Sequence, residues 1–342
     1  MSEPIAFIFP GQGSQAVGMG ADVAAASPAA RVVFERADRR LGFALADLCF
    51  QGPEETLRET INAQPAIVAV SLALLAALEA YLVASNARAS ERLRPASVAG
   101  HSVGEYAALV ASGALDLEAA LALVRERGRL MHEEGTVCPG GMAAVLGLDD
   151  AALQEVCAQA TEETLAALGA QAGKHPGMGR VVVANYNSPG QVVISGEQQA
   201  LARAMELASA RGAKRVMPLS VSGAFHSPVM EPASAGLARA VQEAPLGEAT
   251  IPLISNISAT PLTEADALRT ELARQIVSPV QWVKTVEFLA AQGVTLFVEI
   301  GPGQVLSGLV KRIVKGATTL NISAAADVER VGDELLSRVQ AA

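Results

Sequence analysis

Short apolar runs and longer apolar stripes alternate along the chain, and the two patterns predict different elements. The run Ile5–Phe9 predicts a strand. The Ser-Pro pair at positions 27–28 is typical of a helix N-cap followed by the first helical residue. Residues 62–83 predict a long core helix, and residues 85–95 predict a polar connector. The central apolar stretch of that helix, residues 66–78, looks too short to span a bilayer, so we expect no membrane segment.

A strand followed at once by a helix brackets a serine that has a glycine two residues to either side. Val98 and Ala99 end a short apolar run, and residues 102–111 have the pattern of a helix. A second helix is predicted over residues 117–131. The junction between strand and helix is where this serine could be presented for chemistry.

The middle of the chain, residues 137–221, has a pattern of its own. Its elements follow the order β-α-β-β-α-β, which is the order of a ferredoxin-like unit. The predicted strands are residues 142–146, 181–184, 192–195 and 214–219, and the predicted helices are residues 151–168 and 197–210. The flanking segments, 1–136 and 222–342, alternate strands with helices, which favours a mainly parallel α/β sheet. We therefore expect an α/β core into which a ferredoxin-like subdomain is inserted.

Composition narrows the class of protein. The formal net charge is −9, which argues against a nucleic-acid-binding protein. The three cysteines, Cys49, Cys138 and Cys157, are widely spaced, which fits a reducing compartment and not a disulfide scaffold. The four histidines lack zinc-site spacing, so no metal site is expected. The N-terminus has no signal-peptide pattern, and we expect a cytoplasmic protein.

Gly100-His101-Ser102-Val103-Gly104 fits the G-x-S-x-G pattern of a nucleophile elbow. In such an elbow a sharp turn raises the serine hydroxyl above the sheet, at the N-terminus of the following helix. Free backbone N–H groups and the helix dipole favour developing negative charge at that place. The sequence therefore predicts that Ser102 is the nucleophile of an acyl-transfer enzyme.

A nucleophilic serine needs a base, and four histidines are available. His101 should be turned away by the elbow, His132 reads as a C-terminal cap, and His175 lies in a glycine-rich loop where we expect it to be solvated. His226 follows a predicted strand, and its place after the serine suits an α/β-hydrolase-like order. Glu299 ends a strand but reads as a structural or solvated carboxylate. We therefore expect a Ser-His dyad.

A second glycine pattern competes with this interpretation. Gly11, Gly13 and Ala16 follow a strand and formally fit the dinucleotide fingerprint G-x-G-x-x-A, with Glu35 at a suitable distance beyond them. The segment around Glu35 has the pattern of a helix, whereas a nicotinamide site needs a second strand ending in an acidic residue. We expect this loop instead to offer a backbone N–H group to an oxyanion hole.

Eight segments that occur in one order along the chain point to a family. They are residues 9–15 (FPGQGSQ), 64–66 (QPA), 100–106 (GHSVGEY), 125–128 (RERG), 187–191 (NSPGQ), 224–228 (AFHSP), 279–282 (PVQW) and 299–303 (EIGPG). Together they resemble the malonyl-CoA:acyl carrier protein transacylases, acyltransferases of fatty-acid synthesis that also occur as domains of polyketide synthases. The resemblance covers nearly the whole chain and implies an α/β-hydrolase-like core with the ferredoxin-like insertion.

The resemblance implies catalytic roles residue by residue. Ser102 is the implied nucleophile and His226 the implied base, and the amides of Gln12 and Val103 are the implied oxyanion hole. It further implies that Gln275 orients His226 through its backbone carbonyl, which would account for the missing acid.

The resemblance also implies which residues choose the substrate. Arg127 would hold the malonyl carboxylate, because a guanidinium binds a carboxylate through two parallel hydrogen bonds. The residues alone could not separate Arg127 from Arg125 and Arg129. Phe225 resembles the malonyl-selective form of its loop, and Asn256 matches a family asparagine near the histidine.

The implied reaction moves a malonyl group from malonyl-CoA to the phosphopantetheine thiol of holo acyl carrier protein, with ping-pong kinetics and no cofactor. Two alternatives stay open at this point, a serine esterase or thioesterase and a non-catalytic or nicotinamide-binding protein. Two basic clusters are candidates for docking an acidic carrier protein: Lys311, Arg312 and Lys315, and Arg211, Lys214 and Arg215. Residues 164–180 look longer than in compact family members.

Overall fold

A six-stranded sheet forms the centre of the larger part of the molecule, which is described here from a computed structural model over residues 4–341. Its strands lie in the order β10 (Thr318–Ile322), β9 (Leu296–Ile300), β1 (Ile5–Phe9), β2 (Ser97–Gly100), β7 (Leu253–Ile254) and β8 (Pro261–Leu262). The neighbouring pairs are parallel except for β7 and β8, which are antiparallel. The prediction of a mainly parallel sheet is confirmed.

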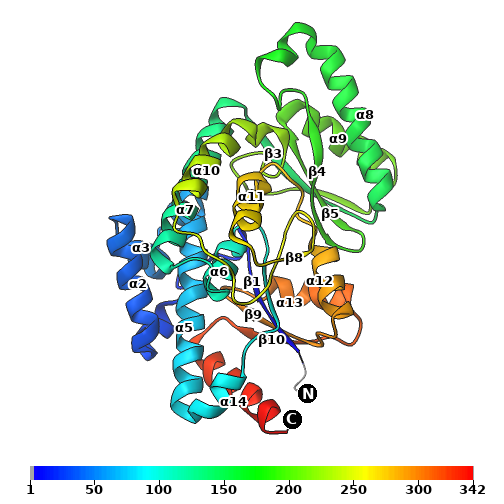
Figure 1. Ribbon diagram of the computed structural model, residues 1–342. Helices are drawn as coiled ribbons and strands as arrows, with labels where there is room; N and C mark the ends of the chain where they lie inside the picture. The colour runs from blue at the N-terminus through cyan, green and yellow to red at the C-terminus, as the bar shows by residue number, and fades with distance from the viewer. Residues whose placement is uncertain (1–3, 342) are drawn as a thin grey trace.

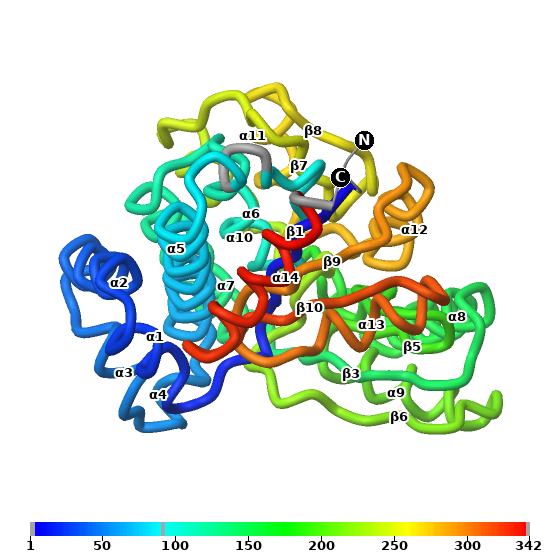
Figure 2. The backbone as a smooth tube through the Cα atoms, turned by 90° about the horizontal axis from the view of Figure 1, so that it is seen from below, coloured from blue at the N-terminus to red at the C-terminus, as the bar shows by residue number. Residues whose placement is uncertain are grey.

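Helices cover both faces of this sheet because its central strand is apolar on both. Ile5, Phe7 and Phe9 of β1 belong to a core with one set of helices, while Ala6 and Ile8 belong to a core with another. The first set is α2 (Pro28–Leu41), α5 (Thr60–Arg92), α6 (Gly104–Ala111), α7 (Leu117–Val137) and α14 (Ala325–Ala341); the second is α12 (Trp282–Ala291) and α13 (Val305–Ile313). Figure 2 shows α2 and α5 on one side of β1 and β9, and α12 and α13 on the other.

The remaining helices of the larger part are short or lie at its edge. They are α1 (Ala21–Ala26), α3 (Leu45–Gln51), α4 (Glu54–Arg58), the 3-10 turn η2 (Pro228–Met230), α10 (Glu231–Glu243) and α11 (Ala265–Gln275). The N-cap expected at Ser27 is confirmed, since its side chain accepts a hydrogen bond from the Ala30 N–H and Pro28 is the first helical residue.

A second, four-stranded sheet forms a lobe beside the first (Figure 1). Its strands lie in the order β4 (Val181–Ser188), β5 (Gln191–Glu197), β3 (Gly140–Leu146) and β6 (Arg215–Pro218), and every neighbouring pair is antiparallel. Helices α8 (Asp150–Leu168) and α9 (Gln198–Ala210) pack on one face, and the turn η1 (Gly169–Lys174) follows α8. The ferredoxin-like order is confirmed.

The side chains of the second sheet alternate between two cores. Ala143 and Val145 of β3 pack with α8 and α9, whereas Met142 and Ala144 belong to the main core. A parallel bridge between Asn185 and Val280 joins the edge strand β4 to the segment before α12. The small sheet is therefore fixed against the large one, with the ends of both near the nucleophile.

The long helix α5 corrects two expectations. Residues 85–92 continue as helix after a break at Asn86 (φ −161°, ψ 92°), so the expected connector over 85–95 is mostly helical. The helix is also longer than its apolar stretch suggested, and the Thr60–Ala89 part is long and apolar enough to cross a membrane. However, 72% of its most apolar 18-residue stretch is buried inside the molecule, which is typical of a core helix.

Candidate active site

The nucleophile elbow has the backbone that its sequence predicts. Ser102 stands between β2 and α6 with φ 52°, a left-handed conformation that non-glycine residues rarely adopt. A Cβ atom on Gly100 would lie 2.0 Å from the carbonyl carbon of Gly104, and one on Gly104 would lie 2.2 Å from the carbonyl oxygen of Phe9. Both glycines are therefore required for the strand and helix to meet at this angle.

His226 meets Ser102 from the other side of the pocket. Its Nε2 lies 2.7 Å from Ser102 Oγ, and its Nδ1 lies 3.0 Å from the carbonyl oxygens of both Gln275 and Ser278. Because carbonyl oxygens only accept, Nδ1 carries the proton and Nε2 is left to accept from the serine hydroxyl. Burial, followed by the positive charge of Arg127, lowers the pKa of His226 to about 3, so the imidazole is neutral near pH 7.

Arg127 of α7 points its guanidinium at the nucleophile. Its Nη2 donates to Ser102 Oγ at 3.0 Å and to Gln275 Oε1 at 2.9 Å, and its Nη1 donates to Gln64 Oε1 at 2.6 Å. The side chain is 1% exposed and makes no ion pair with any described residue, so the buried guanidinium has no anion in direct contact. A carboxylate placed beside Ser102 would supply that partner.

The neighbouring arginines are occupied elsewhere. Arg125 donates to Ile61 O and Asn62 Oδ1, and Arg129 pairs with Glu126 and Glu133 on the helix surface. The side chains thus differ in a way that their spacing could not reveal, and of the three only Arg127 contacts Ser102.

Two residues that line the pocket have backbone N–H groups without an acceptor among the described residues. Gln12, Val103, Ser102, Arg127 and His226 are among the residues that line a cavity of about 140 Å³. Within the described part of the chain, the N–H groups of Gln12 and Val103 donate to no acceptor. Val103 also immediately precedes the first residue of α6, where the helix dipole favours negative charge. Free donors at this place are suited to an oxyanion.

Phe225 lines the cavity beside Ser102 and His226, whereas Asn256 does not line it. Phe225 is 5% exposed and lines the same cavity, where its ring adds bulk. Asn256 lies beneath the elbow: its Oδ1 accepts from the Ser102 N–H at 2.7 Å, and its Nδ2 donates to Gly100 O at 2.7 Å. Asn256 therefore contacts the nucleophile's backbone and is not hydrogen-bonded to His226.

The other histidines have structural contacts, and two expectations about them were wrong. His101 Nε2 lies 2.8 Å from Asn187 Oδ1, so it is a hydrogen-bonding residue as expected. His132 lies within α7, which runs on to Val137, so it is not a C-terminal cap. His175 is not solvated, because its Nε2 lies 2.8 Å from Glu134 Oε1 with both side chains about nine-tenths buried.

Glu299 and Glu35, the two remaining candidates from the sequence, both have structural and not catalytic surroundings. Glu299 is fully buried and accepts from the N–H groups of Leu306 and Ser307, which caps the start of α13. Glu35 lies inside α2 and not at the end of a strand, so the geometry of a nicotinamide site is missing there. Among residues 4–341, no group of three or more His, Cys, Asp or Glu side chains is arranged to hold a metal ion.

Sequence reasoning missed three polar residues that support the site: Gln64, Ser278 and Glu105. Gln64 and Ser278 contact Arg127 and His226 directly. Glu105 is fully buried one helical turn beyond Ser102 and contacts both Asn256 and Gln275. The available signal for Glu105 was a single carboxylate in an otherwise apolar helix segment (residues 105–110), since such a group is rarely buried without partners.

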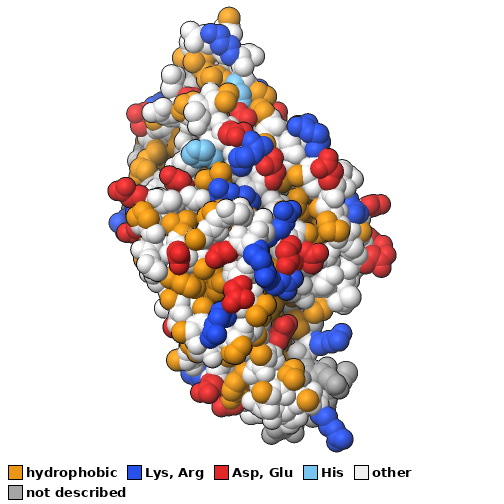
Figure 3. Space-filling model, turned by 90° about the vertical axis from the view of Figure 1, so that its left-hand side faces the viewer, with side chains coloured by type: hydrophobic (Ala, Val, Ile, Leu, Met, Phe, Trp, Pro, Cys, Tyr) orange, Lys and Arg blue, Asp and Glu red, His pale blue; other side chains and the backbone are white. Residues whose placement is uncertain are grey.

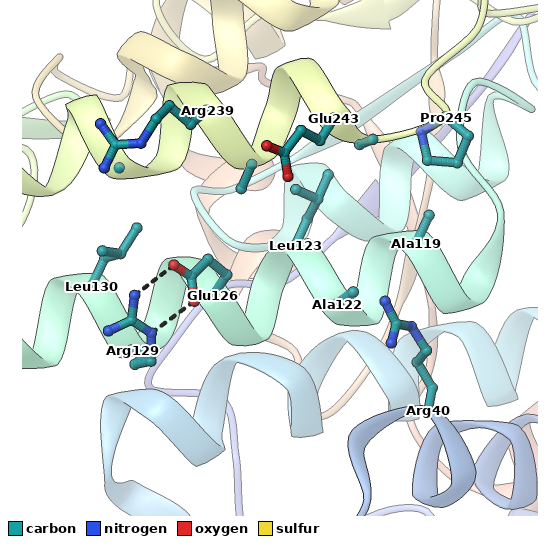
Figure 4. A pocket seen from close by; sticks show the side chains of 13 residues that line it. Arg40, Ala119, Ala122, Leu123, Glu126, Arg129, Leu130, Arg239, Glu243 and Pro245 are labelled. Carbon is teal, nitrogen blue, oxygen red and sulfur yellow. Dashed lines mark hydrogen bonds and ion pairs between the residues drawn. The ribbon is translucent and has the colours of Figure 1, made fainter.

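A larger groove elsewhere offers no comparable chemistry. About 560 Å³ in volume, it lies between α7 and α10 and is lined partly by Leu123, Glu126, Arg129 and Arg239 (Figure 4). Arg129 is held there by Glu126, and no nucleophile lines the groove. The face that includes α2 and α3 mixes acidic, basic and apolar side chains without a large patch of one sign (Figure 3).

Comparison with known proteins places this fold and site in a class. Residues 6–333 match the family model described as the acyl transferase domain, so the chain belongs to the acyl transferase family. Within it, the chain is 42% identical to the malonyl CoA-acyl carrier protein transacylase of Bacillus subtilis over 93% of each chain. It is 43% identical to the transacylase of the same name from Escherichia coli, over 92% of this chain and 94% of that one.

Solved structures agree over nearly the full length. An acyl-carrier-protein S-malonyltransferase from Bartonella henselae superposes with a TM-score of 0.87 at 38% identity, covering 97% of this chain and 99% of that one. A malonyl-transacylase solved with a type II PKS acyl-carrier protein gives a TM-score of 0.86 at 37% identity, with the same coverage. The chain is thus a member of the malonyl CoA-acyl carrier protein transacylases, as its motifs indicated.

Proposed function

We propose that this protein transfers the malonyl group of malonyl-CoA to the phosphopantetheine thiol of holo acyl carrier protein through a malonyl-Ser102 intermediate. The product would supply fatty-acid or polyketide chain extension. The observation that carries the proposal is the meeting of three side chains at one oxygen: Ser102 Oγ lies 2.7 Å from His226 Nε2 and 3.0 Å from Arg127 Nη2. One neighbour suits proton removal, and the other suits a substrate that carries a carboxylate.

In the first half-reaction, Ser102 Oγ attacks the thioester carbonyl and its proton passes to His226 Nε2. The new C–O bond places the negative charge on the carbonyl oxygen, beside the free amides of Gln12 and Val103. The C–S bond then breaks, and His226 gives its proton to the sulfur of coenzyme A. Coenzyme A leaves as its thiol, and malonyl-Ser102 remains. The carbonyl oxygens of Gln275 and Ser278 stabilise the positive imidazolium in place of a carboxylate.

In the second half-reaction, the carrier's thiol gives its proton to His226 and attacks malonyl-Ser102. The ester C–O bond breaks, the thioester forms, and His226 returns the proton to Ser102. Because both half-reactions use the same atoms, we expect ping-pong kinetics. The nucleophile and the base are both side chains of this protein, so we propose that no cofactor takes part.

Arg127 and Phe225 are proposed to choose the acyl group. The Arg127 guanidinium has no negative partner among the described residues, and a malonyl carboxylate would become one. Phe225 fills part of a cavity of only about 140 Å³, which leaves little room for a branch on the α-carbon. Arg127 thus favours malonyl over acetyl groups, and Phe225 favours malonyl over methylmalonyl groups.

For carrier docking we propose Lys311, Arg312 and Lys315. A second cavity of about 180 Å³ shares Gln12, His101 and Asn187 with the first, and the first turns of α13 line its other side. Arg312, in the last turn of α13, donates to Gln191, which also lines this cavity. The alternative cluster, Arg211, Lys214 and Arg215, lies at the start of β6, whereas the strand's other end leads to the pocket. We also propose a cytoplasmic location, since all three cysteines are free and buried.

Intact-mass measurement of the acyl-enzyme tests this function. Wild-type protein mixed with malonyl-CoA should gain the mass of one malonyl group and lose it when holo carrier protein is added. The Ser102→Ala variant should gain nothing. Rapid loss of the adduct without carrier would favour a thioesterase, and the absence of any adduct on the wild-type protein would contradict the mechanism.

A further inference from the structure

Glu105 is fully buried in the first turn of α6, and its side chain accepts every hydrogen bond that it makes with the described residues. Its Oε1 accepts from the backbone N–H of Asn256 at 3.1 Å and from Asn256 Nδ2 at 2.8 Å. Its Oε2 accepts a short hydrogen bond from Gln275 Nε2. Glu105 contacts neither Ser102 Oγ nor the cavity, so it is outside the group that would touch substrate.

These contacts fix which way the Gln275 amide faces. The NH₂ group of Gln275 is the end that faces Glu105, because it also meets the Ser102 carbonyl, which can only accept. The same NH₂ group donates to Ser102 O at 3.1 Å. The opposite end, Oε1, therefore faces Arg127 Nη2 at 2.9 Å. Glu105 and the Ser102 carbonyl thus together hold the Gln275 amide so that the guanidinium meets an acceptor.

Asn256 is oriented by the same carboxylate. Its NH₂ group lies between Glu105 and the Gly100 carbonyl, which leaves Oδ1 to accept from the Ser102 N–H. Both amides that hold the elbow and the guanidinium are therefore hydrogen-bonded to one buried acid. Gln275 Oε1 accepts a hydrogen bond from Arg127, whereas Asn256 Oδ1 accepts one from the backbone N–H of Ser102.

We propose that Glu105 is a positioning residue for acyl-group selection, which acts by holding the Gln275 amide so that Oε1 anchors the Arg127 guanidinium beside Ser102. This inference rests on the proposed function. A purely structural role would affect all acyl groups equally, since every substrate needs the elbow. A role through Gln275 and Arg127 affects chiefly the acyl group that carries a carboxylate.

The Glu105→Gln variant separates these roles because glutamine keeps the size of the side chain but exchanges one acceptor for a donor. If its oxygen faces the two donors of Asn256, its NH₂ group faces the NH₂ group of Gln275. The Gln275 amide then faces a donor where it had an acceptor, and a shift or rotation that relieves this repulsion weakens the hydrogen bond from Arg127 to its Oε1. We expect kcat/KM for malonyl loading to fall about tenfold more than kcat/KM for acetyl loading, with a raised KM for malonyl-CoA.

Glu271→Gln is the matched control. Glu271 is 7% exposed and its side chain accepts from Ser255 Oγ at 2.6 Å and from the Ile257 N–H at 3.0 Å, and it has no hydrogen bond to the Gln275 amide or to Arg127. The Glu271→Gln variant replaces a carboxyl group in the same buried region. It should leave the ratio of kcat/KM for malonyl and acetyl loading within about twofold of wild type.

The readout is competition between equimolar malonyl-CoA and acetyl-CoA, scored by intact mass, together with KM and kcat for each. Should Glu105→Gln not fold, as judged by its thermal transition, Gln275→Met replaces it, because methionine keeps the backbone carbonyl for His226 and removes Oε1. A folded variant with the wild-type ratio overturns the proposal, as does an equal loss in Glu271→Gln. Failure of the wild-type protein to form malonyl-Ser102 would instead contradict the proposed function.

Discussion

At the residue scale, the site combines a guanidinium that has no ion pair with two backbone N–H groups that have no acceptor among the described residues. Arg127 is buried without an ion pair among residues 4–341, and its positive charge adds to burial in lowering the pKa of His226. Burial also lowers the pKa of the Arg127 guanidinium, although an arginine remains protonated in proteins. One side chain is thereby expected both to bind the malonyl carboxylate and to keep the base neutral.

Arg127→Ala should have two effects that can be measured separately. Malonyl loading should slow by roughly a hundredfold and acetyl loading by much less, because only malonyl offers a carboxylate to the guanidinium. In addition, the wild-type acid limb of kcat/KM for acetyl-CoA should lie below pH 6.5, since the folded pKa of His226 is depressed to about 3. Removing the positive charge should move that limb upward, without reaching pH 6.5 because burial remains.

Arg129→Ala is the control for this prediction, because Arg129 lies on the same helix but pairs with Glu126 and Glu133 on the surface. It should leave both loading rates and the pH profile unchanged. Equal slowing of malonyl and acetyl loading in Arg127→Ala would rule out a carboxylate clamp.

At the scale of elements, the junction between β2 and α6 places the nucleophile, and its close approach to β1 leaves no space for a side chain. Gly104 packs directly against β1, and a Cβ atom on it would lie 2.2 Å from the carbonyl oxygen of Phe9. The first turn of α6 also presents the Val103 amide to the pocket. A small shift of this helix therefore displaces Ser102 and the Val103 amide, the proposed nucleophile and oxyanion donor, together.

Gly104→Ala should reduce malonyl loading by more than a hundredfold, because a backbone contact of 2.2 Å forces α6 away from β1. Unfolding free energy should also fall, by about 1–3 kcal/mol. Gly308→Ala in α13 is the control, since nothing lies within 4 Å of its missing Cβ, and it should be neutral or slightly stabilising. Thermal unfolding and the rate of adduct formation measure both effects, and a fully active Gly104→Ala would contradict the assigned geometry.

At the scale of the whole molecule, the reaction site lies where the two sheets meet. The large sheet supplies Ser102, and the small sheet supplies Met142, Asn185 and Val193 to the lining of the same cavity. The division into 1–136, 137–221 and 222–342 stays a prediction, although the four strands of the small sheet all fall between Gly140 and Pro218. Helix α13 lines a cavity at this meeting place, where we propose that the phosphopantetheine arm of the carrier protein enters.

Lys311→Glu should separate loading from transfer. Lys311 is exposed in the last turn of α13, so reversal of its charge should weaken an acidic carrier protein and raise its KM about fivefold at low salt, with a smaller effect at high salt. Malonyl loading from malonyl-CoA should stay within twofold of wild type. Lys214→Glu, in the alternative cluster, is the comparison: an effect confined to Lys214→Glu would move the docking surface to α9 and β6.

The sequence by itself determined the elements, the family and the nucleophile, because each depends on local order. Strand Ile5–Phe9, the Ser27 cap and the elbow at Ser102 are all encoded within a few neighbouring residues. Local reading failed where a segment's state depends on remote contacts. The helix beyond Asn86 looked like a connector because its residues are polar, and His175 looked solvated because its partner, Glu134, is 41 positions away.

Only the tertiary structure decided which polar groups act together. Arg125, Arg127 and Arg129 are equivalent in sequence, yet only Arg127 is turned by α7 toward Ser102. Packing of α6 and α11 brings Glu105 to Gln275 across 170 positions, and no local pattern records such a distance. The sequence thus determined the turn that presents Ser102, while burial and long-range contacts determined which charged groups and side-chain amides surround it.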